Sequence, residues 1–542
     1  MAALVTDQFR INNAGNFLGD ITDPNNSYYI FLGLVNPGIQ SAYGRKTDWD
    51  SSPQSPIDNI NYENHVTDTM IFGKKITPAN ARRVVKKRTW TQGSRYEMYR
   101  HDYSISNPSP LTDKSKLYDA SYFIVNKDYN VYICIDNGST GISTISKEGQ
   151  PSQNEPLFTG LEASRASGTN DDGYIWKFLF SVSPSDIIKF DSTEYIPLPN
   201  DWSSTSDSQI VSVRENSDSD VNNNQIKKVW IDNPGSGYPD ITGQEFNIVG
   251  DGSSGKVNID VVNSSIDNIV VSSGGQGYTY GVVDLSGIST APLAASPPTP
   301  AKLIPIIPPT KGHGYDVYQE LGGDKVMVYA RFDDSTKDFP IDTKFAQIGI
   351  IKNPTAVGSS STFTESQFSS VGALYLDAPS GSIAPGDRIY QDIKSGSVSI
   401  GTAYGYVVSY DVITSGVSTS AVLKYYQDRS LYFNPESGDQ TDFANITRLG
   451  NQSTGQIYSF QSTTEQIKKI GGGFSSGIET SFNGISTNPT GNKIIDLGVE
   501  FNSGIALAEI NKGSGEIIYL DNRKLINRDP RQKEDVKIIL EF

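Results

Sequence analysis

Short runs of β-branched and aromatic residues, each closed by Gly, Pro, Asn or Ser, recur along this chain and constrain its fold. The runs at residues 131–135 and 535–542 are typical. Such runs predict strands that end at turns, because Gly and Asn tolerate turn conformations and Pro cannot continue a sheet. A chain of 542 residues exceeds what one core usually holds. We therefore expect a multi-domain protein that is mainly β or α+β.

An internal repeat marks residues 206–310 as a separate β module. One β-branched run leads into Gly235-Ser236-Gly237-Tyr238, and another leads into Gly275-Gln276-Gly277-Tyr278. Gly permits positive φ at such turns, and the Tyr side chain can pack back over the turn. We expect two related β units here, inserted into the fold and followed by an extended Pro-rich linker at 296–309.

The patterns together predict a discontinuous scaffold with two inserted all-β modules. The expected segments are an α+β scaffold at 1–205, the β module at 206–310, a scaffold return at 311–355, a second β module at 356–489, and scaffold strands at 490–542. The second module is expected to be a small barrel or sandwich. The most specific local elements are strands at 28–35, 171–180, 401–410, 421–426, 516–520 and 535–542, a hairpin within 118–135, and a helix after Ser183.

Net charge limits the partners of the chain. With 61 acidic and 45 basic residues the net charge is −16, which repels nucleic acid phosphates. One basic segment, residues 81–88 with Arg95 and Arg100 beyond it, is either a solvated or salt-bridging strand or a contact for an acidic partner surface. We expect no signal peptide, no membrane span and no nucleic acid partner, with folding in the cytoplasm.

Motifs for catalysis are missing or incomplete. The residues from Gly250 to Lys256 have the spacing of a phosphate-binding loop, but Val257 replaces the Ser or Thr that would hold magnesium, and a strand pattern follows instead of a helix. The single cysteine, Cys134, lies in an apolar run, so we expect a buried and unreactive strand thiol.

Titratable residues give no recognised site either. His65, His101 and His313 lack partners at a metal-ligand spacing, and His101 and Asp102 would point to opposite faces of a strand. Asp171–Asp172 and Asp333–Asp334 lie in turn contexts, where solvated carboxylates are expected. A glycosidase carboxylate pair stays open, since it is defined by spacing in three dimensions. We predict no catalytic residue, no cofactor-binding or metal-binding residue, and no enzymatic activity.

Several segments, in order, resemble one family of phage tail proteins. They are residues 4–10, 84–90 with 94–96, 172–180, 194–199, 348–354, 515–523 and 535–542. Together they are similar to the gene product eight family, the baseplate wedge subunits of T-even-like contractile-tailed bacteriophages. The resemblance covers residues 1–205, 311–355 and 490–542, so this chain would be an enlarged form whose two β modules lack a counterpart.

This resemblance implies a structural protein of the virion tail baseplate. It implies a fold that combines α+β parts with a β-sandwich, a homodimer within each wedge, and contacts with other wedge proteins, including subunits that bear tail fibres. It implies no catalytic residue, and assembly in the host bacterial cytoplasm. Such a protein would hold one geometry and re-pack when the tail sheath contracts.

Two other functions stay open on the sequence. The Gly-Tyr repeats and Asn/Ser-rich surfaces also suit a receptor-binding or glycan-binding tail fibre protein, or adhesin, although a fibre should show long shaft repeats or form a trimer. A carboxylate-dependent glycan hydrolase in the tail is the third possibility. Oligomeric state separates the first two, because a dimer favours the wedge subunit and a stable trimer favours the fibre.

Overall fold

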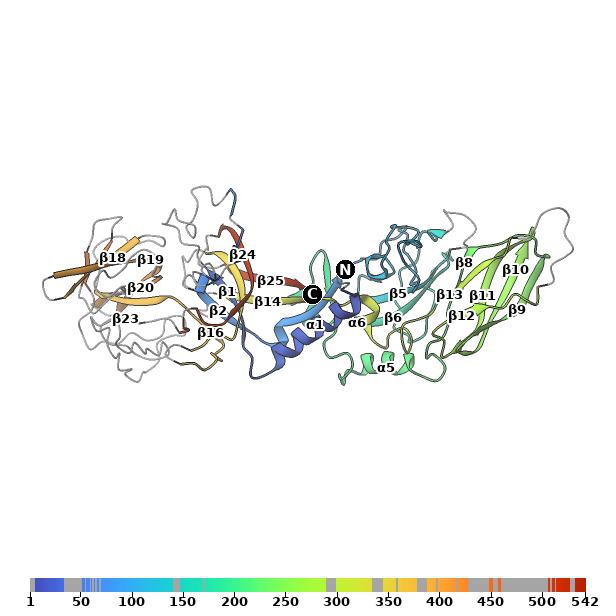
Figure 1. The fold of residues 1–542 in the computed structure, drawn as a ribbon, viewed down its shortest axis with the longest axis horizontal. Coiled ribbons are helices and arrows are strands. Elements are labelled where there is room, and N and C mark those ends of the chain that lie inside the picture. The colour runs from blue at the N-terminus through green and yellow to red at the C-terminus, as the bar shows by residue number, and fades with distance from the viewer. Residues whose placement is uncertain are drawn as a thin grey trace. The chain divides into compact units, whose positions relative to one another are not determined.

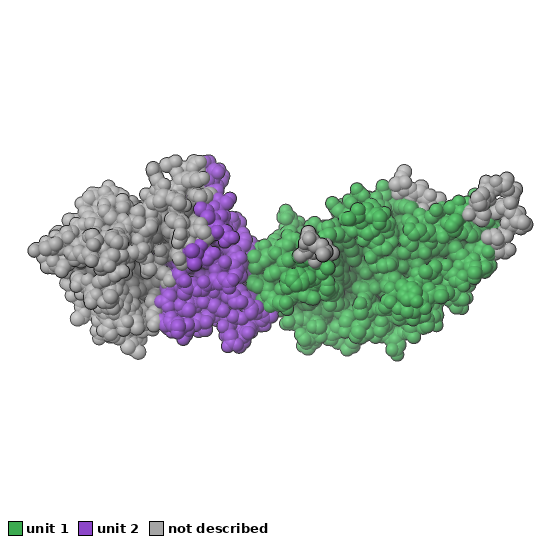
Figure 2. All heavy atoms as spheres, in the orientation of Figure 1, with its two compact units in different colours: residues 1–18, 82–327, 539–542 green, residues 19–81, 328–538 purple. Residues whose placement is uncertain are grey.

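The chain forms two compact units (Figures 1 and 2). The computed structural model describes residues 5–33, 51–53, 55–58, 60, 63, 66–67, 70–139, 147–168, 171–288, 299–333, 345–356, 359–377, 388–395, 398–415, 418–426, 448–451, 457–459, 505–506, 509–511, 513–526 and 532–542. Unit 1 comprises residues 1–18, 82–327 and 539–542, and unit 2 comprises residues 19–81 and 328–538. The chain therefore passes from one unit to the other four times, and neither unit is a continuous segment.

The main core of unit 1 surrounds a three-stranded antiparallel sheet in the order β4-β5-β6. Its strands are β4 (Phe123–Val125), β5 (Asn130–Asn137) and β6 (Tyr174–Ser181). Their aromatic and β-branched side chains are buried on both faces, and Trp176 stacks on Tyr174 with ring centroids 5.2 Å apart. The predicted hairpin and the predicted 171–180 strand are both confirmed.

Helices in unit 1 begin at capping residues, as helix starts commonly do. Ser183 caps α4 by accepting a hydrogen bond from Asp186 N, and Asp207 caps α5 by accepting from Gln209 N and Ile210 N. The helix predicted after Ser183 is thus confirmed. The helical bounds are α1 (Asp7–Thr22), η1 (Pro78–Asn80), η2 (Leu117–Asp119), α4 (Pro184–Phe190), α5 (Ser208–Ser217) and α6 (Val317–Leu321). Figure 1 shows α5 alongside β6, against which it packs.

A second sheet has the order β25-β14-β3-β7. Its strands are β3 (Ala81–Lys86), β7 (Tyr195–Pro197), β14 (Lys325–Asp333) and β25 (Lys533–Glu541). The last strand was expected to be tied into a sheet, and it is. At its end, Phe542 N donates to Asp324 O at 3.3 Å, and the Phe542 ring lies 5.4 Å from that of Phe17. Residues 539–542 therefore complete the packing of unit 1.

The region with the Gly-Tyr repeat forms its own β core. A four-stranded antiparallel sheet, ordered β11-β10-β9-β12, contains β9 (Ile241–Gly250), β10 (Ser253–Val262), β11 (Ser265–Gln276) and β12 (Gly281–Val283). A two-stranded sheet pairs β8 (Val229–Asn233) with β13 (Lys302–Pro305). Along β10 the side chains of Val257, Ile259 and Val261 point into the core while their neighbours do not, as period-two alternation predicts.

Both Gly-x-Gly-Tyr turns adopt the conformation expected for them. Gly275 has φ of 60° and Gly277 has φ of 74°, and a Cβ on Gly275 would lie 2.2 Å from Ser253 O. Tyr278 is fully buried; its hydroxyl accepts a hydrogen bond from Gly255 N and donates one to Ile248 O, both at 3.0 Å. The tyrosine therefore ties its turn to two neighbouring strands.

Unit 2 contains a five-stranded antiparallel sheet in the order β16-β2-β1-β15-β24. Its strands are β1 (Tyr28–Gly33), β2 (Met70–Ile76), β15 (Phe345–Lys352), β16 (Gln367–Phe368) and β24 (Glu516–Ile526). Tyr29, Phe31 and Phe368 are completely buried in its core. The strands predicted at 28–35 and 516–520 are confirmed as β1 and β24, while residues 34 and 35 lie outside the described residues.

A seven-stranded antiparallel sheet occupies part of residues 372–506. Its order is β22-β21-β18-β19-β20-β17-β23, and its strands are β17 (Gly372–Asp377), β18 (Arg388–Ser395), β19 (Val398–Ser415), β20 (Ser418–Tyr426), β21 (Arg448–Asn451), β22 (Ile457–Ser459) and β23 (Ile505–Ala506). The strands predicted at 401–410 and 421–426 are confirmed. A barrel or sandwich stays a prediction.

The predicted fold class is confirmed, because the chain is mainly β and built from several antiparallel sheets. The five expected segment boundaries stay predictions, as does the extended linker, of which residues 296–298 lie outside the described residues. Among the described helices, none is long and apolar enough to cross a membrane.

Candidate functional site: a charged pocket in unit 1

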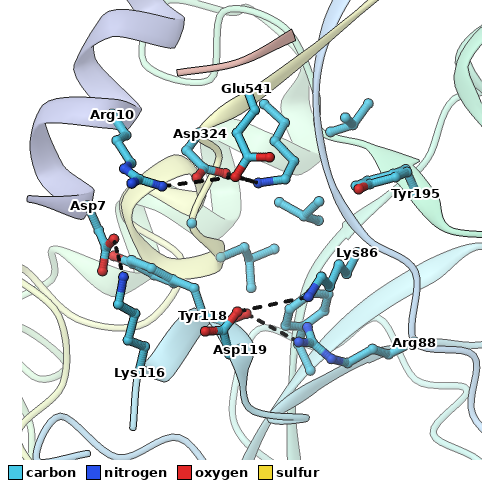
Figure 3. Close-up of a pocket in the computed structure, with 16 residues that line it drawn as sticks. Asp7, Arg10, Lys86, Arg88, Lys116, Tyr118, Asp119, Tyr195, Asp324 and Glu541 are labelled. Carbon is cyan, nitrogen blue, oxygen red and sulfur yellow. Dashed lines mark hydrogen bonds and ion pairs between the residues drawn. The ribbon is translucent and has the colours of Figure 1, made fainter. Parts of the chain in front are cut away.

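A pocket of 350 Å³ lies in unit 1, and every residue that lines it belongs to that unit (Figure 3). Its walls come from segments that are far apart in the sequence, including α1, β3, η2 and the ends of β14 and β25. Charged side chains dominate the lining; the basic ones are Arg10, Lys86, Arg88, Lys116 and Lys325, and the acidic ones are Asp7, Asp119, Asp324 and Glu541.

The backbone at the end of α6 shapes one wall. The helix ends at Gly322, whose φ of 73° is left-handed, as is common one residue past a helix end. A Cβ there would lie 2.5 Å from Cγ of Tyr118, so glycine is what lets this ring pack against the turn. Tyr118 donates its hydroxyl proton to Gln319 O at 2.7 Å, and burial raises the pKa of Tyr118 to about 12. This phenol is a neutral donor at physiological pH.

One carboxylate of the pocket is firmly paired. Lys325 Nζ lies 3.0 Å from Glu541 Oε1 and 3.2 Å from Asp324 Oδ1. The hydrogen bond from Lys325 holds the pKa of Glu541 below its usual value. Burial alone would lower the pKa of Lys325, but the hydrogen bonds and charges of Glu541 and Asp324 together outweigh burial and the pKa is raised. Both groups are therefore charged at neutral pH, and together they link β14 to the end of β25.

Three other cations of the pocket form only long ion pairs. Lys86 Nζ is 3.9 Å from Asp119 Oδ1, Lys116 Nζ is 3.7 Å from Asp7 Oδ1, and Arg10 Nη1 is 3.9 Å from Glu541 Oε1. The side chains of Lys86 and Lys116 are 56% and 57% exposed. Exposed ion pairs at such distances contribute about 0–1 kcal/mol, so these cations can exchange partners at little cost.

Arg88 differs from the other cations of the pocket. Its Nη2 donates to Tyr118 O at 3.2 Å, and its guanidinium lies over the Phe123 ring at 4.4 Å. Its Nη1 is buried and has no hydrogen-bond partner within the described part of the chain. Burial lowers the pKa of Arg88, because the charged form is separated from water. Arg88 is thus a fixed cation in the wall of the pocket, and its unused donor is buried.

The basic segment containing Lys86 and Arg88 is mostly paired within the protein. Arg82 binds Asp186 at 3.0 Å and Lys87 binds Asp191 at 2.8 Å, which confirms the salt-bridging reading for these two residues. Arg83 is buried: its Nη1 donates to Ile11 O and Gly323 O, and its guanidinium lies 4.3 Å from the Tyr318 ring. Lys86 is the exposed cation of this strand.

The two arginines beyond the segment also bind internally. Arg95 Nη1 donates to Gly149 O. Arg100 is 1% exposed, makes two hydrogen bonds to Asp102 at 2.9 and 2.7 Å, and lies 4.2 Å from the Trp230 ring. Trp230 belongs to β8, so this arginine fastens the predicted N-terminal scaffold to the predicted β module.

The histidines do not form a site within the described residues, and His65 lies outside them. His101 Nδ1 accepts a hydrogen bond from Ile307 N at 3.2 Å, and burial lowers the pKa of His101, so it is a neutral structural acceptor. His313 Nδ1 lies 2.6 Å from Glu320 Oε1 in the core. Ser217 is adjacent but donates to the backbone carbonyl of His313, so these three residues are not arranged as a catalytic triad.

Structural roles also account for the cysteine and for the phosphate-loop spacing. Cys134 is fully buried, and burial raises the pKa of its thiol well above the usual value. Asp251 and Gly252 join β9 to β10 in an antiparallel hairpin, so residues 253–256 begin a strand where a phosphate-binding loop needs a helix. The predictions of a buried thiol and a hairpin turn are confirmed.

One prediction about acidic pairs is wrong. Asp172 was expected to be solvated, but it is half-buried, and its carboxylate accepts hydrogen bonds from Gln153 N at 2.7 Å, Asn154 N at 3.2 Å and Tyr174 N at 3.1 Å. Asp171 is exposed and Asp333 ends β14, while Asp334 lies outside the described residues. In the described ranges, no three His, Cys, Asp or Glu side chains are grouped so as to hold a metal ion.

Sequence reasoning missed both the pocket and the His313–Glu320 pair. The pocket unites residues separated by hundreds of positions, such as Asp7, Asp119 and Glu541, and no local spacing marks them. The available signal was the basic segment itself, which singled out Lys86 and Arg88 without indicating that Lys86 alone points outward. His313 and Glu320 are seven residues apart across a loop and α6, which is not a ligand spacing.

Comparison with known proteins gives one informative similarity. No family model matches the chain. Over 220 residues, 36% of its length, the chain is 24% identical to the baseplate wedge protein gp8 of Enterobacteria phage T4. The match spans 60% of that protein, less than two thirds of its length. The similarity supports a distant relationship to a baseplate wedge protein, in agreement with the resemblance found in the sequence.

Proposed function

We propose that this chain is a structural subunit of a phage tail baseplate wedge. The observation that carries the proposal is the 220-residue similarity to the T4 baseplate wedge protein. In support, most cations of the basic segment are used to hold unit 1 together, His313 and Cys134 are buried, and His101 accepts a hydrogen bond from the backbone of Ile307. The protein works by presenting sheet-built surfaces to neighbouring wedge subunits, without turning over a substrate.

The finer features of this role belong to the same proposal. The chain is a homodimer within each wedge, lies in the virion tail baseplate, and is assembled in the host cytoplasm. Its neighbours are other wedge proteins, including subunits that bear tail fibres. When the sheath contracts, its interfaces re-pack while each sheet stays intact, because packed cores switch between discrete arrangements more easily than they deform.

Locating the protein in purified virions tests the proposal. An epitope tag inserted in an exposed turn, such as the β10–β11 turn at Asn263 and Ser264, is detected by electron microscopy of labelled particles. We expect label at the baseplate, and a dimer by light scattering of the purified chain. Label along fibres together with a stable trimer, or absence of the chain from virions, would contradict the proposal.

A further inference from the structure

The charged pocket of unit 1 has the composition of a binding site for negative charge. Five cations and four carboxylates line it, whereas the whole chain has a net charge of −16. Each of the four carboxylates already has a lysine or arginine within 4.0 Å. Two of these contacts, from Lys86 Nζ and Lys116 Nζ, are 3.9 and 3.7 Å long, which is beyond hydrogen-bond distance. These two exposed ammonium groups therefore have donors available for an incoming acceptor.

The long ion pairs at the exposed edge of the pocket can break to admit an acceptor group. Lys86 is the last residue of β3 and Lys116 directly precedes η2, and both side chains line the pocket (Figure 3). The Lys86–Asp119 contact, at 3.9 Å, is long for an ion pair, and both side chains are about half exposed. An incoming carboxylate can form charge-assisted hydrogen bonds of about 2.7–2.9 Å with these cations, which are shorter and stronger than the present contacts.

We propose that this pocket binds an acidic segment of a neighbouring protein, with one or two Asp or Glu carboxylates seated at Lys86 and Lys116. The proposal rests on the assembly role proposed above. Charge complementarity favours a protein carboxylate, while the overall negative charge of the chain opposes a nucleic acid backbone. The volume of 350 Å³ suits one or two side chains rather than a folded element. The sequence left open that the basic segment contacts an acidic partner surface, and the proposal places that contact at Lys86.

The test uses the full chain and a fluorescent octaglutamate peptide as probe, followed by fluorescence anisotropy at low and physiological salt. The variant is Lys86→Glu with Lys116→Glu. The matched control is Lys127→Glu with Lys302→Glu, which makes the same charge change at cations that are 65% and 67% exposed and lie outside the pocket. We expect the pocket variant to weaken binding roughly tenfold or more, and the control by less than about threefold.

A third variant is expected to strengthen peptide binding. Asp119→Asn removes the carboxylate that competes for Lys86, so it should tighten peptide binding, and a misfolded protein would not do so. Equal loss in the pocket and control variants, equal binding of an uncharged Gly-Ser peptide, or no binding by the wild type would overturn the proposal. Displacement by inorganic phosphate at a lower concentration than by the peptide would assign the pocket to a small anion instead.

The outcome is separate from that of the baseplate proposal. A chain found in the baseplate of virions, with peptide binding unchanged in the Lys86→Glu/Lys116→Glu variant, would overturn the pocket assignment alone. Specific peptide binding by a chain that is absent from virions would overturn the baseplate role alone.

Discussion

Replacing Asp102 by Asn should destabilise unit 1 strongly, because it leaves a buried charge without its partner. Arg100 is 1% exposed and is held by Asp102 through two parallel hydrogen bonds, at 2.9 and 2.7 Å. The carboxylate also accepts from Asn107 Nδ2 at 2.8 Å. An asparagine keeps the shape but removes the charge, and its amide NH₂ turns a donor toward Arg100 or Asn107.

The expected loss is about 3–5 kcal/mol, the range for breaking a buried ion pair by removing one partner. Burial alone would raise the pKa of Asp102, but the hydrogen bonds and charge of Arg100 outweigh burial and lower it below 3.8. A carboxyl group whose folded pKa is depressed contributes its stability above the unfolded pKa and loses it as pH falls through the folded pKa. The difference between wild type and Asp102→Asn should therefore be full near pH 7 and shrink below about pH 3.8.

Hydrogen exchange followed by mass spectrometry measures this loss as the opening free energy of peptides that cover β8, which carries Trp230 over Arg100. Glu245→Gln is the control, since its pair with Lys256 is equally short at 2.7 Å but exposed, and should cost at most about 1 kcal/mol. The double variant Asp102→Asn/Arg100→Met should be less destabilised than the sum of the single variants. A loss under about 1 kcal/mol in Asp102→Asn would refute the reasoning.

Three further predictions concern buried groups of unit 1. Lys177 is 2% exposed, and burial lowers its pKa from 10.5 to about 8. Between these two pH values the unfolded chain binds a proton that the folded chain does not, so the free energy of unfolding should rise by roughly 3 kcal/mol from pH 8 to 10.5 in the wild type and not in Lys177→Met. Parallel pH profiles of the two proteins in hydrogen exchange would contradict this. Tyr278→Phe removes the buried hydroxyl that bonds Gly255 N and Ile248 O, and should lower the stability of the β9–β12 sheet by about 1–3 kcal/mol in the same assay; no change would mean that neither bond matters. Cys134 should react with Ellman's reagent only after denaturation, because its thiol is buried and burial raises its pKa, and rapid labelling of the native protein would contradict this burial.

Elements whose signals are local were predictable from the sequence. Ser183 followed by Pro184 specified the start of α4, and the alternation after Lys256 specified a strand rather than a nucleotide-binding helix. The glycines at 275 and 277 specified left-handed turns, because other residues adopt that conformation only with strain.

Features created by tertiary contacts were not predictable in this way. Asp172 looked like a turn residue that faces water, yet the chain at 152–154 folds over it and three backbone donors bury it. Arg83 lies in a basic run, but a buried position between α1 and α6 turns it into a packing residue. The charged pocket is lined by segments far apart in the sequence, including strands of the sheet β25-β14-β3-β7, and no local pattern links them.

The division of unit 1 among three stretches of chain affects how the protein is made. Because residues 539–542 supply Glu541 to Lys325 and the Phe542 ring to Phe17, these residues must be synthesised before this unit can close. Until then β14 lacks its neighbouring strand β25, and the packing between the Phe17 and Phe542 rings has not formed. Deletion of residues 539–542 would thus impair a unit that also contains residues 1–18.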